Sequence, residues 1–324
     1  MKCTNKIRAV SMIMTCTLLC GCGKNAYSLP YSTDSTISSY RIIDVAEEDK
    51  SIKPFAAELC VVADDLNDAN IQIEATGAAL FDLNSVQTLY AKNVHEKLAP
   101  ASLTKVLTAL VALQEGTPDM VLTASENVKI TESGAQLLGL KAGDQMTLAQ
   151  ALHVLLIYSA NDVAVLIAEG IAGSVDEFVN MMNDEAKAIG ATNSNFMNPH
   201  GLSADNHYTT VYDMYLILNK AIEYSLFNEI IQMTSYTSTY TDINGNAKEI
   251  DINNSNLFLK GDHTAPEQVT VIGGKTGTTN AAGHCLLLLS KDTSGNPYIS
   301  IVMKADSRDN LYLQMTDLLG KIKN

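Results

Sequence analysis

Runs of alternating or continuous apolar residues predict β-strands at both ends of the chain. These runs cover residues 59–63, 78–83, 88–91, 268–277, 285–289 and 298–303. The second and third runs flank the turn-forming pair Asn84–Ser85, which predicts a hairpin. Apolar residues at helical spacing follow the last run and predict a terminal helix over residues 311–322.

Between these strands, apolar residues recur at the spacing of buried helices. The first such helix begins after Pro100 and ends at Gly116. Its apolar positions are Leu103, Val106, Leu107, Leu110, Val111 and Leu113. Capping patterns at Thr147 and Ser174 open further helices. The section over residues 100–235 is therefore predicted to be predominantly helical.

Strands at both ends and helices between them predict an α+β fold. The expected core is a mostly antiparallel sheet, formed by both chain ends and flanked by helices, with a central all-helical subdomain. Residues 120–146 contain only short apolar pieces. Residues 236–268 are polar and predict a hairpin or loops.

Composition and charge exclude some classes of function but add little to the prediction of the fold. The chain has 324 residues, of which 46% are hydrophobic, enough for a sizeable core. Its formal net charge is −14, and no basic cluster occurs after the first eight residues. Nucleic-acid binding requires a positive surface. We therefore expect no nucleic-acid partner and a solvated acidic surface.

The N-terminus has the pattern of an export signal. A positively charged start precedes an apolar run over residues 9–19, which is too short to span a bilayer. The sequence Leu19-Cys20-Gly21-Cys22 resembles a lipoprotein signal, with Cys22 as the lipid acceptor. We predict a signal peptide over residues 1–21 and a lipidated Cys22 that anchors the protein to the outer face of the cytoplasmic membrane. Simple secretion is the alternative.

A flexible linker and two isolated cysteines follow the leader. Residues 22–54 are rich in Ser, Thr, Asp and Glu and are predicted to form a tether behind the lipid anchor. Beyond it, only Cys60 and Cys285 remain, both inside strand-like runs. Buried free thiols are the favoured interpretation, and a disulfide between them is the alternative.

Three short polar patterns occur at helix or strand ends, namely Ser102-x-x-Lys105, Ser159-x-Asn161 and Lys275-Thr276-Gly277. A hydroxyl and an amine three positions apart lie on one face of a helical turn. A lysine one helical turn after the serine, in an apolar setting, can lose its proton and act as a base. The first pattern is therefore a candidate nucleophile beside its activator. Taken alone, it also fits a helix cap and a surface lysine.

Together with their flanking residues, these patterns resemble the serine-type D-Ala-D-Ala carboxypeptidases, which are the low-molecular-weight penicillin-binding proteins. The matching stretches are residues 97–105, 196–202, 206–210, 275–279 and 282–286. The resemblance covers nearly all of residues 57–320 and implies the fold of β-lactamases and DD-peptidases. It also implies a catalytic domain over residues 55–324. Many relatives continue into a β-rich second domain, and as a departure from that pattern we expect none here.

The resemblance implies acyl transfer on peptidoglycan stem peptides, with β-lactam antibiotics as covalent inhibitors and with no cofactor or metal. Ser102 would attack the carbonyl between the last two D-alanines while Lys105 takes its proton. Ser159 would relay a proton to the leaving amine, and Asn161 would orient the substrate amide. The residues expected to bind the terminal carboxylate or to bring the strand close to it are Lys275, Thr276, Gly277, Thr278 and Arg308. The backbone N–H groups of Ser102 and Thr278 would form the oxyanion hole.

Several other functions remain as alternatives. A class A β-lactamase would carry Ser-Asp-Asn in the second pattern and a deacylating Glu near residues 193–199, and this chain has neither. DD-endopeptidase action on cross-links and a catalytically silent wall-binding lipoprotein also stay open. His200 and His207, near Asp205, lack the spacing of a zinc peptidase, so we expect structural roles for both.

Overall fold

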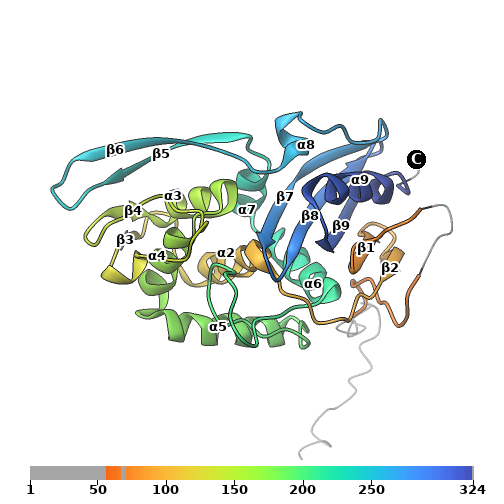
Figure 1. Cartoon of the computed structure of the whole chain (residues 1–324), viewed down its shortest axis with the longest axis horizontal. Helices are drawn as coiled ribbons and strands as arrows, with labels where there is room; N and C mark the ends of the chain where they lie inside the picture. The colour runs from red at the N-terminus through yellow and green to blue at the C-terminus, as the bar shows by residue number, and fades with distance from the viewer. Residues whose placement is uncertain (1–55, 67–70, 323–324) are drawn as a thin grey trace, which may run out of the picture. The chain divides into compact units, whose positions relative to one another are not determined.

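In the computed structural model, which describes residues 56–66 and 71–322, a five-stranded antiparallel sheet joins both ends of the described chain (Figure 1). Its strands are β1 (Gly77–Asp82), β2 (Gln87–Lys92), β7 (Val269–Thr279), β8 (Gly283–Asp292) and β9 (Pro297–Ala305). They lie in the order β2-β1-β9-β8-β7, so the N-terminal hairpin pairs with the last strand. The predicted hairpin, the three C-terminal strands and the sheet formed by both chain ends are confirmed.

The segment over residues 59–63 does not form the predicted strand. The backbone N–H of Cys60 donates to the Tyr215 hydroxyl at 2.9 Å, and the Tyr212 hydroxyl donates to the Cys60 carbonyl at 2.9 Å. Because two tyrosine side chains satisfy these backbone groups, the segment needs no strand partner. Cys60 and Cys285 are both buried and unpaired, so the free-thiol interpretation is confirmed.

The side chains of the five-stranded sheet alternate between two separate cores. One face packs against α9 (Arg308–Leu319) and buries Leu80 and Leu288 there. The opposite face packs against the helical middle section and buries Phe81 and Leu287. The alternation follows from strand geometry, in which successive side chains point to opposite faces. Figure 1 shows α9 lying across β8 and β9.

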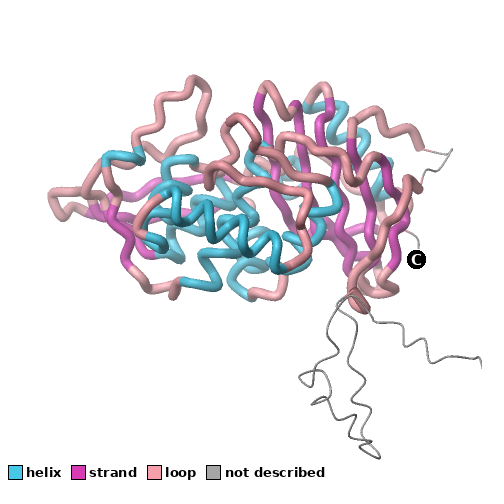
Figure 2. The backbone as a smooth tube through the Cα atoms, turned by 90° about the horizontal axis from the view of Figure 1, so that it is seen from below, coloured by secondary structure: helices cyan, strands magenta, loops and turns pink. Residues whose placement is uncertain are grey.

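The middle section is built mainly from helices, as predicted. They are α2 (Thr104–Glu115), α3 (Leu148–His153), α4 (Asn161–Ala172), α5 (Val175–Ala188), α6 (Val211–Ala221) and α7 (Ser225–Ile231). A 3-10 turn, η1 (Ala101–Leu103), precedes α2, and a π-helix, η3 (Val154–Tyr158), follows α3. Figure 2 shows these helices gathered beside the strands of the large sheet. Helix α2 contacts α4, α5 and α6 and is the centre of this section.

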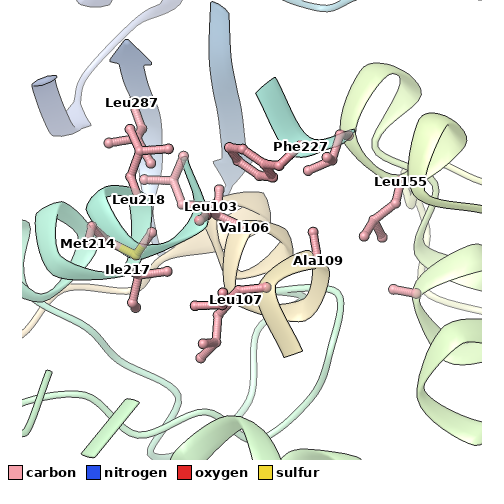
Figure 3. Close-up of a cluster of buried hydrophobic side chains, with 14 of the residues drawn as sticks. Leu103, Val106, Leu107, Ala109, Leu155, Met214, Ile217, Leu218, Phe227 and Leu287 are labelled. Carbon is pink, nitrogen blue, oxygen red and sulfur yellow. The ribbon is translucent and has the colours of Figure 1, made fainter. Parts of the chain in front are cut away.

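The core around α2 is apolar on the sides that face its neighbours. Figure 3 shows four residues of η1 and α2 packed among side chains from the surrounding elements. These residues are Leu103, Val106, Leu107 and Ala109, with Leu155, Met214, Ile217, Leu218, Phe227 and Leu287 around them. This packing fixes the position of the turn that carries Ser102 and Lys105.

A second sheet lies at the edge of the helical section. Its strands are β3 (Val121–Thr123), β4 (Gln145–Thr147), β5 (Ser235–Thr241) and β6 (Ala247–Asn253), in that order. The hairpin of β5 and β6 agrees with the prediction for residues 236–268. Strands β3 and β4 have three residues each, too few for an alternating pattern to be recognised. The middle section is therefore mostly rather than wholly helical, and the short helices η2 (Glu126–Val128) and α8 (Leu257–Lys260) complete the fold.

The predicted signal peptide over residues 1–21, Cys22 and the linker up to residue 54 lie outside the described residues. The described residues all belong to a unit that spans Pro54–Asn324. None of the helices in this described part of the chain is long and apolar enough to cross a membrane.

Candidate active site

Ser102 stands in a strained turn before the central helix. Ala101 has a φ of 47°, in the left-handed region that costs a non-glycine residue about 1–3 kcal/mol. The Thr104 hydroxyl donates to the Ala101 carbonyl at 2.8 Å and so helps to hold this turn. Ser102 remains partly exposed, whereas Lys105, one helical turn further on, is fully buried.

The amine of Lys105 connects three segments of the chain. Its Nζ lies 2.9 Å from Ser102 Oγ, 2.7 Å from Asn161 Oδ1 and 2.5 Å from the backbone carbonyl oxygen of His200. A neutral amine has one lone pair, so it can donate to the amide and carbonyl oxygens and accept from the serine hydroxyl. The structure thus brings together two of the three sequence patterns around one nitrogen atom.

Two buried lysines determine the electrostatics of this cluster. Burial lowers the pKa of Lys105 well below its usual range, the charge of Lys275 lowers it further, and the charge of Asp162 raises it. Lys275 is only 2% exposed, and burial lowers its pKa to about 7. A lysine that loses its proton this easily can take the proton of an adjacent hydroxyl.

The segment over residues 196–202 forms a backbone cradle for the first turns of α2. The Pro199 carbonyl accepts a hydrogen bond from the Thr108 hydroxyl at 2.6 Å. The next carbonyl along the chain, that of His200, accepts from Lys105. Two consecutive carbonyl groups therefore bind side chains from two positions of the same helix face, which fixes the segment against the helix.

Gly201 allows this segment to approach the Ser102 turn. Its φ is 87°, and a Cβ at this position would lie 1.9 Å from the Ala101 carbonyl oxygen. The Asn198 side chain accepts a hydrogen bond from the Gly201 N–H at 2.7 Å, which holds the tight turn. A side chain at position 201 would collide with backbone, so only glycine fits without displacing the turn.

His200 and His207 are neutral hydrogen-bonding groups here. Burial lowers the pKa of His200 to about 3, with the charge of Lys105 adding to the effect, and burial lowers the pKa of His207 to about 4. His207 Nδ1 accepts from the Met197 N–H at 3.1 Å, so its Nε2 donates to the Thr104 hydroxyl at 3.0 Å. His200 Nδ1 accepts from the Leu202 N–H at 3.1 Å, so both rings have structural contacts. In the described part of the chain, no group of three or more His, Cys, Asp or Glu side chains is placed to hold a metal ion.

Ser159 and Asn161 stand where the π-helix η3 meets α4. Ser159 has a φ of 66° and a ψ of 29°, ends η3 and is 9% exposed. Helix α4 then begins at Asn161, whose side chain contacts Lys105. Single π-helical turns occur frequently at functional sites. Ser159 ends this turn in the left-handed region and precedes by two residues Asn161, the residue that contacts Lys105.

Strand β7 passes directly beside the Ser102 turn. A Cβ at Gly277 would lie 3.0 Å from the Ser102 backbone nitrogen, so the absence of a side chain permits this approach. The sequence predicted that Gly277 would let the strand approach a ligand, and the structure places it against the backbone of Ser102. Thr278 follows on the strand, with its hydroxyl 3.3 Å from His284 Nδ1.

Ser255 connects Thr276 to Arg308. The Ser255 and Thr276 hydroxyl oxygens are 2.5 Å apart, and Arg308 Nη2 donates weakly to the Ser255 carbonyl at 3.5 Å. Lys275 Nζ donates to the Thr276 carbonyl at 2.9 Å. Three of the residues expected to bind a carboxylate thus belong to one hydrogen-bonded group at the edge of β7.

Sequence reasoning missed two features of this site. The His200 carbonyl is a backbone group, and a backbone acceptor has no side-chain signature. Ser255 lies in the polar stretch over residues 236–268, where one hydroxyl among many gave no signal. The local motif Asn198–Leu202 was the available indication that this segment contributes to the site.

The chain is similar in sequence to known D-alanyl-D-alanine carboxypeptidases. A family model described as D-alanyl-D-alanine carboxypeptidase matches residues 63–307. The D-alanyl-D-alanine carboxypeptidase DacF of Bacillus subtilis is 33% identical over 272 residues, which are 82% of this chain and 66% of that protein. The chain thus spans slightly less than two thirds of the length of this curated relative.

Solved structures share the fold. Penicillin-binding protein 5 of Haemophilus influenzae superimposes with a TM-score of 0.69 at 28% identity, covering 78% of this chain and 72% of that chain. The Streptomyces K15 DD-transpeptidase gives a TM-score of 0.71 at 24% identity, covering 78% of this chain and 97% of that chain. The α+β fold predicted from the sequence is therefore confirmed as that of DD-peptidases.

We expect Gly201→Ala to disturb the Ser102 turn. The new Cβ would displace the Ala101 carbonyl and lower the free energy of unfolding by about 2–3 kcal/mol through strain and overpacking. It should also slow the reaction of the Ser102 hydroxyl with a serine-directed acylating reagent. Chemical denaturation and stopped-flow labelling measure the two effects.

Gly245→Ala is the matched control for this substitution. Gly245 has a φ of 81°, but a Cβ there would meet no heavy atom within 4 Å. It should show only the backbone cost of about 1 kcal/mol, with an unchanged labelling rate. Equal effects of the two substitutions would mean that contact with the Ser102 turn has no consequence.

Proposed function

The chain belongs to the D-alanyl-D-alanine carboxypeptidase family, and we propose that it hydrolyses the terminal D-Ala-D-Ala bond of peptidoglycan stem peptides through an acyl-enzyme on Ser102. The observation that carries this proposal is the 2.9 Å contact between Lys105 Nζ and Ser102 Oγ. The buried amine has a lowered pKa, so it can be neutral when the substrate arrives.

Acylation would begin with proton transfer from Ser102 Oγ to the neutral Lys105 amine. The oxygen forms a bond to the substrate carbonyl carbon, and the developing oxyanion accepts hydrogen bonds from the backbone N–H groups of Ser102 and Thr278. This placement is supported by the close approach of β7 to the Ser102 backbone. Each such donor contributes about 3–4 kcal/mol in related acyl-transfer reactions.

Collapse of this intermediate would break the C–N bond and release D-alanine. The leaving amine needs a proton, and we assign Ser159, two residues before Asn161 in the chain, to relay one from the Lys105 ammonium. Asn161 would keep the lysine oriented during this exchange, because its Oδ1 already accepts from Nζ at 2.7 Å. Water then attacks the ester carbonyl, and Ser102 is regenerated with release of the shortened peptide.

The terminal carboxylate of the stem peptide would bind at the edge of β7. Lys275 supplies a positive charge, and the hydroxyls of Thr276 and Thr278 supply donors. Arg308 would assist through its contact with Ser255, which also holds Thr276. A β-lactam carries a carboxylate and a reactive carbonyl in a comparable arrangement, so we also propose that β-lactams acylate Ser102.

We further propose that the protein is exported and anchored at the outer face of the cytoplasmic membrane by lipidated Cys22. The support is the leader pattern over residues 1–21 and the lipoprotein-like sequence that ends at Cys22. The substrate lies outside that membrane, so anchoring would keep the enzyme within reach of newly made wall. The linker over residues 22–54 would give the catalytic domain, residues 55–324, freedom to move above the membrane.

Ser102→Ala should abolish covalent labelling by a fluorescent penicillin and release of D-alanine from a pentapeptide. Ser159→Ala should label but turn over about a hundredfold more slowly, because proton transfer to the leaving amine is impaired. Ser125→Ala removes the serine of a second Ser-x-Asn sequence, outside the proposed site, and should turn over normally. Gel fluorescence and a coupled D-alanine assay measure these effects.

The same assays separate the alternative functions. Labelling that persists in Ser102→Ala would reject the acyl-enzyme. Release of D-alanine from the pentapeptide by the wild type would exclude a silent wall-binding protein. Faster cleavage of cross-linked dimers than of the monomeric pentapeptide would show that the enzyme acts mainly as an endopeptidase.

The rate kcat/KM should depend on pH through both lysines. Lys105 must be neutral, so activity falls as pH falls through its lowered pKa. Lys275 must be charged to bind the carboxylate, so activity falls again as pH rises above its pKa of about 7.

Lys275→Arg should move this alkaline limb to higher pH, since a guanidinium does not titrate there. Lys291→Arg, on an exposed lysine of β8, should leave the profile unchanged, and an alkaline limb identical in all three proteins would reject the assignment.

Replacing Cys22 should release the protein from the membrane. The wild type should incorporate labelled palmitate and sediment with membranes, whereas Cys22→Ala should do neither. Cys20→Ala retains the predicted acceptor and should behave like the wild type. Secretion of an unlipidated wild-type protein would support the alternative of simple export.

A further inference from the structure

A loop over residues 136–140 is fastened to the beginning of α4 by four backbone groups. The Asn161 N–H donates to the Gln136 carbonyl at 2.8 Å. Three consecutive backbone N–H groups of the loop donate to the Asp162 carboxylate, and they belong to Leu138 at 2.9 Å, Gly139 at 2.7 Å and Leu140 at 3.1 Å. The Asp162 side chain is 1% exposed, so these bonds form away from water.

The Asp162 carboxylate does more than an ordinary helix-start carboxylate. Such a residue usually accepts hydrogen bonds from the first N–H groups of its own helix. Here Oδ1 accepts from the Val163 N–H at 3.0 Å and also from Leu138, while both bonds to Oδ2 come from the loop. Three of its four bonds thus hold a segment that precedes it by more than twenty residues. The carboxylate therefore links the loop to the helix through hydrogen bonds.

We propose that Asp162 is a positioning residue, which fixes the first turn of α4 to the loop over residues 136–140 and thereby holds Asn161 against the amine of Lys105. This inference rests on the proposed function, because it assigns a role within the same site. Asn161 is the residue through which Asp162 acts. Its side chain contacts Lys105 and its backbone N–H contacts the loop, so a shift of either partner would move the amide oxygen from the amine.

The charge of Asp162 gives this role an electrostatic signature. The charged and titratable groups that face Lys105 are Lys275 from β7, Asp162 from α4, and His200 with His207 behind it from the segment that cradles α2. Asp162 is the acidic group among them, and its charge opposes the lowering of the Lys105 pKa by burial and by Lys275. On its other side, Asp162 contributes to the raised pKa of the Tyr240 hydroxyl. Burial is the largest cause of that shift, Asp144 and Asp242 also raise this pKa, and Lys248 lowers it.

The substitution Asp162→Asn separates positioning from general support of the fold. The asparagine amide retains one acceptor oxygen, but its NH₂ group would face loop N–H groups that are also donors, so those hydrogen bonds would be lost. We expect amide hydrogen exchange at Gly139 and Leu140 to be at least about tenfold faster. Acylation by a fluorescent penicillin should be slower at its optimum, because Asn161 is less well held. Its acid limb should move to lower pH by about one unit, since Lys105 loses a nearby negative charge.

Asp144→Asn is the matched control. Asp144 is 3% exposed and accepts backbone hydrogen bonds from Lys141 at 2.9 Å and Ile243 at 3.2 Å, so it also fastens loops. It makes no contact with Asn161 or Lys105 among the described residues. We expect a loss of stability, read as a lower thermal midpoint, without a shift of the acid limb.

The outcomes distinguish this inference from the proposed function. If the wild type is not acylated by penicillin, the proposed function fails. If the wild type is acylated but Asp162→Asn and Asp144→Asn share the wild-type acid limb, Asp162 only supports the fold and the inference is overturned.

A measurement on the wild type covers the case in which Asp162→Asn does not fold. In an NMR titration, the Lys105 Nζ resonance reports the charge of the amine, and the Gly139 amide proton reports the field at the Asp162 carboxylate. We expect both to change with one midpoint. A Gly139 amide proton that does not respond when Lys105 titrates would overturn the inference.

Discussion

The burial of the Lys105 amine is the constraint on which the rest of the site depends. Burying an ammonium group without partners would lower the stability of the fold by several kcal/mol. Two features of the protein reduce this penalty. The protein surrounds the nitrogen with oxygen atoms from Ser102, Asn161 and His200, and it lowers the pKa so that the group can be neutral. Each oxygen comes from a different segment, so the α2 core, the start of α4 and the 196–202 cradle must all be placed accurately.

This requirement explains two of the unusual backbone conformations in the described chain, those of Ala101 and Ser159. Ala101 and Ser159 are non-glycine residues with positive φ, and the π-helix η3 ends at Ser159. Such conformations persist only where surrounding contacts over-determine them. At Ala101 those contacts are the Thr104 hydroxyl and the tight approach of Gly201. The apolar packing of α2 thus supplies the rigidity that the strained turn uses to present the serine.

The sequence was sufficient for side-chain patterns and insufficient for backbone contacts. The periodicity of apolar residues and the capping residues predicted the sheet and the helices, because side-chain polarity determines which positions are buried. The three-residue spacing predicted that Ser102 lies beside Lys105. Apolar character over residues 59–63 suggested a strand, yet tyrosine hydroxyls from a distant helix satisfy that backbone. The His200 carbonyl and the loop over residues 136–140 act through main-chain atoms, which every residue possesses and no pattern marks.

The interaction between the two lysines makes the basicity of Lys105 depend on whether a carboxylate is bound at Lys275. While Lys275 is charged, it lowers the pKa of Lys105 and makes the amine a weaker base. A carboxylate bound at Lys275 would raise the pKa of Lys275 and offset its field at Lys105. Burial would then be the main effect that keeps Lys105 neutral, and the amine would be more basic in the complex than in the free enzyme. Under the proposed function, a substrate without the terminal carboxylate would lose binding and also this gain in basicity, so the carboxylate would be required for reaction as well as for recognition.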